Sequence, residues 1–461
     1  MNKKQYKNVY FAGAGGIGMA ALVRYYLGKG LRVAGYDRTC TALTSQLEKE
    51  GAEIVYDDSV ELIPDYCRDK DTTLVVYTPA LPSDHPGLCY FRDGGFDVMK
   101  RAQVLGLLTH DSKGLCFSGT HGKTTTSSMA AHILHSSSIG CNAFLGGILR
   151  NYDSNFMFSA DSPYTVIEAD EFDRSFHWLN PYMAVVTATD PDHLDIYGTE
   201  EAYLESFAHF TELVQPGGAL IVHTGLKLKP RPQQGVKVYY YSRDEGDFHA
   251  ENVRKGKGEI MFDFVSPKGR INDVVLGVPV DINIENAVAA MAICSLAGVD
   301  DEVMKDAVKT FLGAKRRFEF WLKEPGDHGK VVIDDYAHHP DELRASIRSV
   351  KDLYADRRLS VIFQPHLYSR TRDFAPQFAE ALSHADEVIL LDIYPAREQP
   401  IEGVTSEIIF KDIKCKSKAL CTKKSLVETI KNYNFDVLLT VGAGDICNYL
   451  PEICEIVKSQ R

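Results

Sequence analysis

Short apolar runs that end in glycine-rich or polar clusters recur along the whole chain. The first run, residues 9–12, leads into GAGGIG; a helical pattern follows over residues 19–27, and a second run covers residues 31–35. Apolar runs of four to eight residues bounded by turn residues are typical of buried strands. Their alternation with helical stretches is typical of parallel sheets, so the pattern predicts an α/β protein.

The first glycine cluster has the spacing of a diphosphate-binding turn. Gly13, Gly15 and Gly18 follow a predicted strand and precede a predicted helix, and Asp37 stands at the end of the next strand. Glycines at this spacing let backbone N–H groups approach a pyrophosphate at a helix N-terminus. Since the glycines contact only the pyrophosphate, NAD and a nucleotide sugar are both compatible with the turn. A further strand over residues 73–77 ends at Thr78, at the sheet edge where ligands bind.

Residues 114–126, GLCFSGTHGKTTT, form the second glycine cluster. An apolar strand, a glycine turn and a new helix form a cradle for nucleotide phosphates. Lys123 is expected to reach the β- and γ-phosphates, and Thr124 to offer its hydroxyl to magnesium. The usual motif, GxxxxGK[ST], has its first glycine at the position that Phe117 occupies here. An ordinary glycine turn with a solvated lysine is the alternative.

Two later strands end in acidic clusters that suggest a magnesium site. Residues 164–167 run into Glu168, and residues 183–187 run into TDPDHLDIYG, which contains His193. A carboxylate is a hard ligand for magnesium, and a neutral imidazole is a further candidate. Residues 217–281 alternate short strands with turns and predict extra antiparallel strands. The helical stretch 283–296 opens with Asn283 and Asn286, and one of these is explained by helix capping alone.

The last third of the chain predicts another parallel α/β domain. Four apolar runs, residues 331–333, 360–363, 387–391 and 437–441, are separated by helical stretches and end in polar clusters. Carboxyl ends of parallel strands meet at one sheet edge, where we expect six side chains to gather. These are His338, His339, His366, Arg370, Arg372 and Asp445.

Composition narrows the class of protein. With 461 residues, the chain has room for about three domains. A formal net charge of −12 argues against partners such as nucleic acid or anionic membranes. We find no apolar run long enough to span a bilayer and no signal peptide. The ten cysteines lack CxxC pairs, which indicates reduced thiols in a cytoplasmic protein. For its assembly we expect a monomer or a weak homodimer.

Taken together, the motifs resemble those of the Mur ligase family. The shared segments are GAGGIGM, GTHGKTTT, EADE, DHLDIY, the paired asparagines, RRFE, DDYAHHP, QPHLYSRTRD, DIYPARE and GAGDI. The resemblance implies three α/β domains: a Rossmann-like UDP-binding domain (1–110), a central P-loop ATPase domain (111–312) and a C-terminal Rossmann-like ligase domain (313–461).

QPHLYSRTRD and DIYPARE are most similar to the members that act on L-alanine. The resemblance therefore implies ATP-dependent ligation of L-alanine to the lactyl carboxylate of UDP-N-acetylmuramate in peptidoglycan precursor synthesis, with ATP and Mg²⁺ as cofactors. An acyl phosphate is the implied intermediate. The alternative within the family is a recycling ligase that joins a whole tripeptide to the same sugar nucleotide. A nucleotide-sensing binding protein without turnover and a dehydrogenase are the alternatives outside it.

The resemblance also assigns roles to individual residues. UDP-sugar contacts are assigned to Gly15, Gly16, Ile17, Gly18, Asp37 and Thr78. ATP contacts are assigned to Gly119, Thr120, His121, Gly122, Lys123, Thr124, Thr125, Asn286, Arg317 and Asp335. Metal ligands are assigned to Thr124, Glu168 and His193, and the amino-acid end to Tyr336, His338 and Arg370. The implied catalytic residues are Lys123, Glu168, His193, His338 and Arg370.

Three positions depart from the family pattern. Ile282 stands where many members have a histidine that contacts the nucleotide, and Leu367 stands where many have an arginine. Some relatives carry a carbamylated lysine on the helix after DHxD, and Phe207 occupies that place here. We therefore expect a metal site that does not require CO₂.

Overall fold

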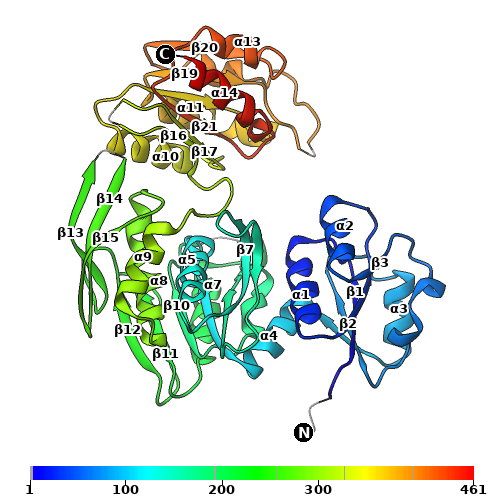
Figure 1. The fold of residues 1–461 in the computed structure, drawn as a ribbon. Coiled ribbons are helices and arrows are strands. Elements are labelled where there is room, and N and C mark those ends of the chain that lie inside the picture. Colours follow the sequence, from blue (N-terminus) through cyan, green and yellow to red (C-terminus); the bar gives the residue numbers. More distant parts are fainter. Residues whose placement is uncertain (1–3, 192–193, 257, 327, 397, 461) are drawn as a thin grey trace. The chain divides into compact units, whose positions relative to one another are not determined.

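The computed structural model describes residues 4–191, 194–256, 258–326, 328–396 and 398–460. The chain forms two compact units (Figure 1). The first contains residues 1–250, 264–271 and 285–308, and the second contains residues 251–263, 272–284 and 309–461. Among the described helices, none combines the length and the apolar run needed to cross a membrane.

A parallel five-stranded sheet begins the first unit, in the order β3-β2-β1-β4-β5. Its strands are β1 (Asn8–Ala12), β2 (Arg32–Tyr36), β3 (Glu53–Val55), β4 (Thr73–Tyr77) and β5 (Asp97–Lys100). Its helices are α1 (Ile17–Gly28), α2 (Ala42–Lys49), α3 (Pro86–Asp93) and α4 (Arg101–Asp111). The strand order reverses next to β1, so the glycine turn after β1 lies at the point where such sheets bind ligands.

The second sheet has seven strands in the order β12-β11-β10-β6-β9-β7-β8. They are β6 (Lys113–Ser118), β7 (Asn142–Leu149), β8 (Ser154–Met157), β9 (Tyr164–Glu168), β10 (Met183–Val186), β11 (Ala219–His223) and β12 (Lys237–Tyr241). Among the described strand pairs of this sheet, β7 and β8 are antiparallel and the others are parallel. The prediction of antiparallel strands over residues 217–281 is therefore wrong for β11 and β12. Thirteen residues join them, which is enough for a parallel return.

The remaining helices of the first unit cover this second sheet or border the phosphate loop. They are α5 (Lys123–Ser136), α6 (Leu194–Tyr197), α7 (Glu200–Glu212), α9 (Asp301–Thr310) and a 3₁₀ segment η3 (Phe172–Trp178), together with α8 (Ile282–Ala297), which starts in the second unit.

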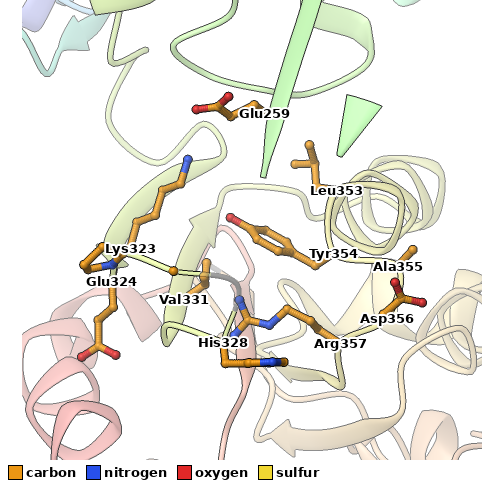
Figure 2. A pocket seen from close by; sticks show the side chains of 12 residues that line it. Glu259, Lys323, Glu324, His328, Val331, Leu353, Tyr354, Ala355, Asp356 and Arg357 are labelled. Carbon is orange, nitrogen blue, oxygen red and sulfur yellow. The ribbon is translucent and has the colours of Figure 1, made fainter. Parts of the chain in front are cut away.

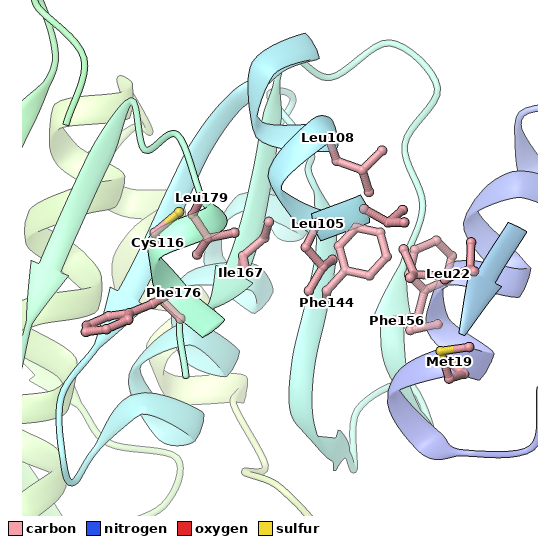
Figure 3. Close-up of a cluster of buried hydrophobic side chains, with 14 of the residues drawn as sticks. Met19, Leu22, Leu105, Leu108, Cys116, Phe144, Phe156, Ile167, Phe176 and Leu179 are labelled. Carbon is pink, nitrogen blue, oxygen red and sulfur yellow. The ribbon is translucent and has the colours of Figure 1, made fainter. Parts of the chain in front are cut away.

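One apolar core joins the two sheets of the first unit (Figure 3). Met19 and Leu22 of α1 belong to the same buried cluster as Phe144 of β7 and Phe156 of β8. At the border, the ring centroids of Tyr25 and Phe144 are 5.6 Å apart. Because α1 of the five-stranded domain packs an aromatic ring on β7 of the second sheet, the first glycine turn and the phosphate loop belong to one compact unit.

The second unit is built on a six-stranded sheet in the order β16-β17-β21-β18-β19-β20. Its strands are β16 (Glu319–Lys323), β17 (Val331–Asp335), β18 (Leu359–Phe363), β19 (Glu387–Leu391), β20 (Ser417–Cys421) and β21 (Val437–Val441). Its helices are α10 (Pro340–Leu353), α11 (Tyr368–Leu382), α12 (Glu407–Phe410), α13 (Leu426–Lys431) and α14 (Leu450–Ser459). The edge strand β16 is antiparallel to β17, and the other pairs are parallel.

A separate three-stranded sheet connects the units in sequence. It contains β13 (His249–Gly256), β14 (Glu259–Ser266) and β15 (Gly269–Val275). The four runs predicted in the last third correspond to β17, β18, β19 and β21, so the α/β fold class is confirmed.

Candidate functional site

The phosphate loop connects β6 to α5, and two glycines shape it. Gly119 has φ 142°, and a Cβ at this position would lie 2.1 Å from Oγ1 of Thr187. Gly122 has φ 83° and is the N-cap of α5. A glycine cap has no side-chain acceptor, which leaves the first-turn N–H groups of the helix for an anion. The predicted loop is thus present, although its first glycine is at position 119 and not at 117.

Lys123, the first residue of α5, is held by a buried carboxylate. Its Nζ donates to Oε1 and Oε2 of Glu171 at 2.9 and 2.7 Å, and to the carbonyl of Gly119 at 2.6 Å. The side chain of Glu171 is 1% exposed. Sequence reasoning missed Glu171, although the EADE cluster contains it. The ammonium is directed at the loop and is neutralised until a more negative group arrives.

Thr124 and Glu168 meet as predicted. The Thr124 hydroxyl donates to Oε1 of Glu168 at 3.0 Å, and the N–H of Gly146 donates to Oε2 at 3.0 Å. Burial raises the pKa of Glu168, although the hydrogen bond from Thr124 and the charge of Lys123 oppose this. The two oxygens form a hard donor pair that fits magnesium. His193, the third predicted ligand, lies outside the described residues.

Other residues of the loop assigned to ATP are fixed by neighbouring strands. Thr120 donates through its hydroxyl to the carbonyl of Asp190 at 2.7 Å, and the carbonyl of His121 accepts from the hydroxyl of Thr187. Thr125 follows in the first turn of α5 and is partly exposed. These contacts fix the backbone of the loop, and the side chain of His121 is exposed.

Asn286 of α8 faces the phosphate loop. Its Oδ1 accepts from the hydroxyl of Thr126 at 3.2 Å and would lie 2.9 Å from a Cβ on Gly122. Asn283 lies inside α8, and its amide donates to the carbonyl of Val278 at 3.1 Å. The helix starts one residue before Asn283, so the capping explanation for either asparagine is wrong. Asn286 therefore lies beside the phosphate loop.

The first glycine turn is closed by its own acidic residue. The N–H of Gly15 donates to Oδ2 of Asp37 at 2.7 Å. Gly13 has φ 90°, and a Cβ there would lie 2.4 Å from Cγ2 of Thr78. Gly16 is the N-cap of α1, so Ile17 and Gly18 are its first two residues. The structure therefore brings together the residues that were assigned to the UDP-sugar.

Arg101, which the sequence analysis did not single out, lies beside this turn. A Cβ on Gly18 would be 2.7 Å from Nη1 of Arg101. Burial lowers the pKa of Arg101, and the charges of Asp170 and Glu168 oppose that shift. The guanidinium thus lies near both the diphosphate turn and the carboxylates of the second sheet. Its place directly after β5, at the edge where ligands bind, is the signal that would have found it.

In the second unit, an acidic pair ends β17. Asp335 accepts from the hydroxyl of Ser346 and from the N–H of Phe318, and burial raises its pKa. Asp334 is fully buried and accepts from the hydroxyl of Thr440 at 2.7 Å. Burial raises the pKa of Asp334 to about 6.

Two adjacent arginines stack over one aromatic ring at this edge. The guanidinium carbons of Arg316 and Arg317 lie 4.9 and 5.8 Å from the ring centroid of Tyr336. The positive charge of Arg317 also opposes the raised pKa of Asp335. Arg317, Asp335 and Tyr336, three of the assigned residues, are therefore neighbours. Arg316 donates instead to the carbonyl of Gly444, so its role is to fix the loop after β21.

Two histidines and one arginine form a second cluster at the same sheet edge. The rings of His338 and His366 are 6.1 Å apart. Burial lowers the pKa of both histidines, and the charge of Arg370 lowers each further. Nη1 of Arg370 and Nδ1 of His366 are buried and have no hydrogen-bond partner among the described residues. A buried guanidinium N–H that lacks an acceptor is suited to a ligand carboxylate.

The other three predicted members of this rim serve the protein itself. His339 is the N-cap of α10, and Arg372 donates to the adjacent Asp373 at 2.7 Å. Asp445 accepts from Gln364 at 2.8 Å and from Lys423 at 2.6 Å. Of the six residues expected to gather, only His338, His366 and Arg370 form the cluster.

Two of the departures have structural consequences. Phe207 is fully buried, and its ring centroid is 5.2 Å from that of Phe176 and 5.1 Å from that of Tyr203. Its place on α7 is therefore a core position. Leu367 has φ 69° and is the N-cap of α11. A branched residue at positive φ is strained by about 1–3 kcal/mol, and such strain concentrates near functional residues.

Comparison with known proteins assigns the family. The descriptions "Mur ligase family, catalytic domain", "Mur ligase middle domain" and "Mur ligase, glutamate ligase domain" match residues 8–113, 117–294 and 316–444. This chain belongs to the Mur ligase family.

Individual relatives narrow the comparison. The chain is 59% identical to the UDP-N-acetylmuramate–L-alanine ligase of Phocaeicola vulgatus, with all of both chains covered. It is 60% identical to the ligase of the same name from Parabacteroides distasonis, with 98% of this chain and 97% of the relative covered.

Solved structures agree on the fold. The crystal structure of the UDP-N-acetylmuramate–alanine ligase of Thermotoga maritima has a TM-score of 0.77 at 27% identity, with 98% of this chain and all of that one covered. A murein peptide ligase from Psychrobacter arcticus has a TM-score of 0.58 at 22% identity, with 98% of each chain covered. At that identity, the second likeness concerns the fold alone.

Proposed function

We propose that this chain joins L-alanine to the lactyl carboxylate of UDP-N-acetylmuramate and hydrolyses ATP to ADP and phosphate. The proposal rests on the phosphate loop, where Lys123 donates to the loop backbone and Thr124 donates to Glu168. The chain that contains this loop is 59% identical, over its full length, to a ligase of that name. Since ATP and UDP-sugars are made and used in the cytoplasm, we place the reaction there, in peptidoglycan precursor synthesis.

The reaction needs activation of a carboxylate. A lactyl carboxylate oxygen attacks the γ-phosphorus of ATP, the bond to the β-phosphate oxygen breaks, and an acyl phosphate and ADP form. The amine of L-alanine then attacks the acyl carbon, phosphate leaves, and the amine loses a proton. Both partners of the first step are anionic, so the site must neutralise negative charge as they approach.

Lys123 supplies the main positive charge in the phosphate loop. When a triphosphate occupies the loop, we infer that the ammonium donates to phosphate oxygens in place of Glu171. Its position at the first turn of α5 also adds the positive end of the helix dipole. The remaining loop residues and Asn286 hold ATP through backbone and amide contacts.

Thr124, Glu168 and His193 are the residues that would hold Mg²⁺. The hydroxyl and carboxylate oxygens within 3.0 Å of each other fit this hard cation. When bound, the ion neutralises phosphate charge during transfer.

The UDP-sugar is assigned to the first glycine turn and to Arg101. The α1 N-terminus takes the diphosphate, and Asp37 keeps the turn in shape through Gly15. Arg101 lies near this turn and near Glu168, so we infer that it pairs with an anionic group of the sugar nucleotide.

L-Alanine is assigned to the cluster in the second unit. Arg370 has an unpartnered buried N–H among the described residues, which suits the carboxylate of the amino acid. Burial and the charge of Arg370 lower the pKa of His338, so its imidazole is neutral at pH 7 and able to take the proton of the attacking amine. Arg317, Asp335 and Tyr336 complete this edge.

The test is phosphate release from ATP in the presence of UDP-N-acetylmuramate, with each amino acid supplied in turn. We expect release with L-alanine, and we expect UDP, but not NAD, to compete for the sugar-nucleotide site. Faster release with the tripeptide than with L-alanine would support the recycling alternative. Equal release with all amino acids, or with none, would contradict the proposal.

A further inference from the structure

A cavity of about 640 Å³ lies at the end of the second unit's sheet away from the histidine cluster (Figure 2). Its walls are the β16–β17 turn, the last turn of α10 with the residues after it, and Glu259 at the start of β14. Val331, at the beginning of β17, forms part of it, whereas Asp335 ends the same strand. The volume is in the range of small-molecule binding sites.

An unpartnered hydroxyl marks the cavity as a binding site. Tyr354 is 8% exposed, and among the described residues its Oη has no hydrogen-bond partner. A Cβ on Gly258, which has φ 73°, would lie 2.6 Å from this oxygen. A buried hydroxyl without a partner carries an uncompensated desolvation free energy. A ligand group that hydrogen-bonds with Tyr354 would recover it on binding.

Lys323 provides a positive charge beside the hydroxyl. In Figure 2 its ammonium and Oη of Tyr354 are directed toward the same space. Nζ of Lys323 donates to the carbonyl of Gly258 at 3.1 Å, which leaves further N–H donors for a ligand. Two donors that point to one space are suited to a carboxylate or a carbonyl oxygen.

The other charges of the cavity select the class of ligand. Glu259, Glu324 and Asp356 contribute carboxylates, of which Glu324 already accepts from the N–H of Lys330 at 2.9 Å. Arg357 is bound to Asp436 at 2.9 Å. Three carboxylates against one available lysine and one histidine, His328, disfavour a nucleotide or another polyanion. They favour a ligand that brings an ammonium group together with its carboxylate.

Apolar side chains supply the rest of the surface. Leu353 and Val331 are nearly fully buried beneath the charged rim, and the ring of Tyr354 adds an aromatic wall. A single alanine is small for such a space, and an apolar ligand would leave the charges unpaired. A short peptide with free termini satisfies the donors, the carboxylates and the apolar surface together.

We propose that this cavity is a second binding site that takes a short zwitterionic peptide. Its carboxylate pairs with Lys323 and Tyr354, its ammonium pairs with Glu259, and an apolar side chain packs on Leu353. The site is separate from the histidine cluster, because α10 runs about 21 Å between them, from its N-cap His339 to Leu353.

The test is calorimetric titration of the full chain with the tripeptide Gly-Leu-Gly, with excess L-alanine present to fill the amino-acid end. We expect saturable binding that Tyr354→Phe weakens about tenfold or more, since a hydrogen bond to a charged group is lost. Lys323→Gln and Glu259→Gln are expected to weaken it a few-fold, because both side chains are exposed. Lys416→Gln, an exposed lysine of the same unit, is the matched control and should bind like the native chain.

Blocked peptides assign the two ends. Amidation of the peptide's carboxyl terminus should lower its affinity for the native chain, but should lower the affinity for Lys323→Gln little further. N-acetylation of the peptide should likewise lower the affinity for the native chain and have little further effect on Glu259→Gln. Without peptide, Tyr354→Phe should unfold at the same temperature as the native chain or a higher one, because an unpaired hydroxyl is removed.

The proposal is overturned if the native chain shows no saturable binding of the peptide, or if Tyr354→Phe binds the peptide with the same affinity as the native chain. Loss of binding in Arg370→Lys with full binding in Tyr354→Phe would place the peptide at the amino-acid end instead.

Discussion

The Nζ of Lys123 lies 2.7 Å from Oε2 of Glu171, and the two side chains are 14% and 1% exposed. A charge pair this well buried has two consequences. The lysine is oriented at the phosphate loop before ATP arrives, and its removal leaves a buried carboxylate without a counter-charge.

Substitution Lys123→Ala should therefore act on both catalysis and stability. We expect ATP-dependent ligation to fall by about 10²–10³, because a donor that stabilises developing charge is lost. The free energy of unfolding should fall by about 3–5 kcal/mol, as it does when one partner of a buried ion pair is removed. Chemical denaturation and a phosphate-release assay measure the two effects.

The double variant Lys123→Ala with Glu171→Gln separates these effects. It should recover most of the lost stability and none of the activity, while binding of UDP-N-acetylmuramate stays close to native. Lys227→Ala, at an exposed lysine paired with Glu200, is the control for loss of a charge. Activity within tenfold of native in Lys123→Ala would remove the lysine from the mechanism.

Arg101→Met should weaken the sugar nucleotide selectively. Because the guanidinium lies near Gly18 and Glu168, we expect KM for UDP-N-acetylmuramate to rise about tenfold or more, and KM for ATP to change little. Steady-state kinetics with each substrate varied in turn measure this. Arg68→Met, at an arginine on the same five-stranded domain that binds backbone carbonyls, serves as the control. Equal effects on both substrates would show a structural role for Arg101 instead.

Arg370→Lys tests the amino-acid end. A lysine keeps the charge but cannot form two parallel hydrogen bonds with a carboxylate. KM for L-alanine should rise by about ten- to a hundredfold, with KM for ATP and for the sugar nucleotide near native. Arg372→Lys, two residues away and paired with Asp373, is the matched control. An unchanged KM for L-alanine would assign the amino acid to other residues.

The rate should not depend on CO₂. Phe207 packs against Phe176 and Tyr203 at the position where some relatives carry a carbamylated lysine. Its ring neither reacts with CO₂ nor binds a hard cation. Assays in buffer stripped of CO₂ and in buffer with added bicarbonate should give the same rate. A rate that rises with bicarbonate would mean that a different lysine is carbamylated.

Asp334 should make stability depend on pH between about 4 and 6. Burial raises its pKa from 3.8 to about 6, so the protonated form is favoured in the folded chain. The contribution of protonated Asp334 to the free energy of unfolding is complete below pH 3.8 and is lost as the pH rises through about 6. At 1.36 kcal/mol for each pH unit, the loss amounts to about 3 kcal/mol.

Asp334→Asn removes this titration, since an amide stays neutral. Its stability relative to the native chain should therefore increase over the same pH interval, as followed by urea unfolding at pH 4, 5, 6 and 7. Asp373→Asn, at an exposed aspartate, should show no such increase. A constant difference between Asp334→Asn and the native chain would contradict the raised pKa.

Much of the fold and of the nucleotide loop follows from contiguous residues. The strand ends at β4, β19 and β21 match the predicted runs residue for residue, because short apolar runs bounded by turn residues encode buried strands locally. The glycines at 13, 119 and 122 have the positive φ values that their turns require. Thr124 and Glu168, which the family resemblance assigned to one metal site, lie within hydrogen-bond distance of each other.

Strand direction was less predictable. Turn residues separate the short strands of residues 217–281, and this pattern predicted antiparallel strands. In the structure, β11 and β12 pair in parallel across a thirteen-residue connection. A connection of this length is long enough for either strand direction. Local residues do not record that choice.

The class of fold and the phosphate loop could be predicted because each depends on residues adjacent in the chain, whereas half of the expected carboxyl-end cluster has other partners. Which polar groups meet could be seen only in the folded chain: Glu171 with Lys123, Arg101 with the first glycine turn, and Tyr354 with the cavity at the beginning of β17. The physical reason is that burial and electrostatic pairing act between side chains that folding brings together, whatever their separation in sequence.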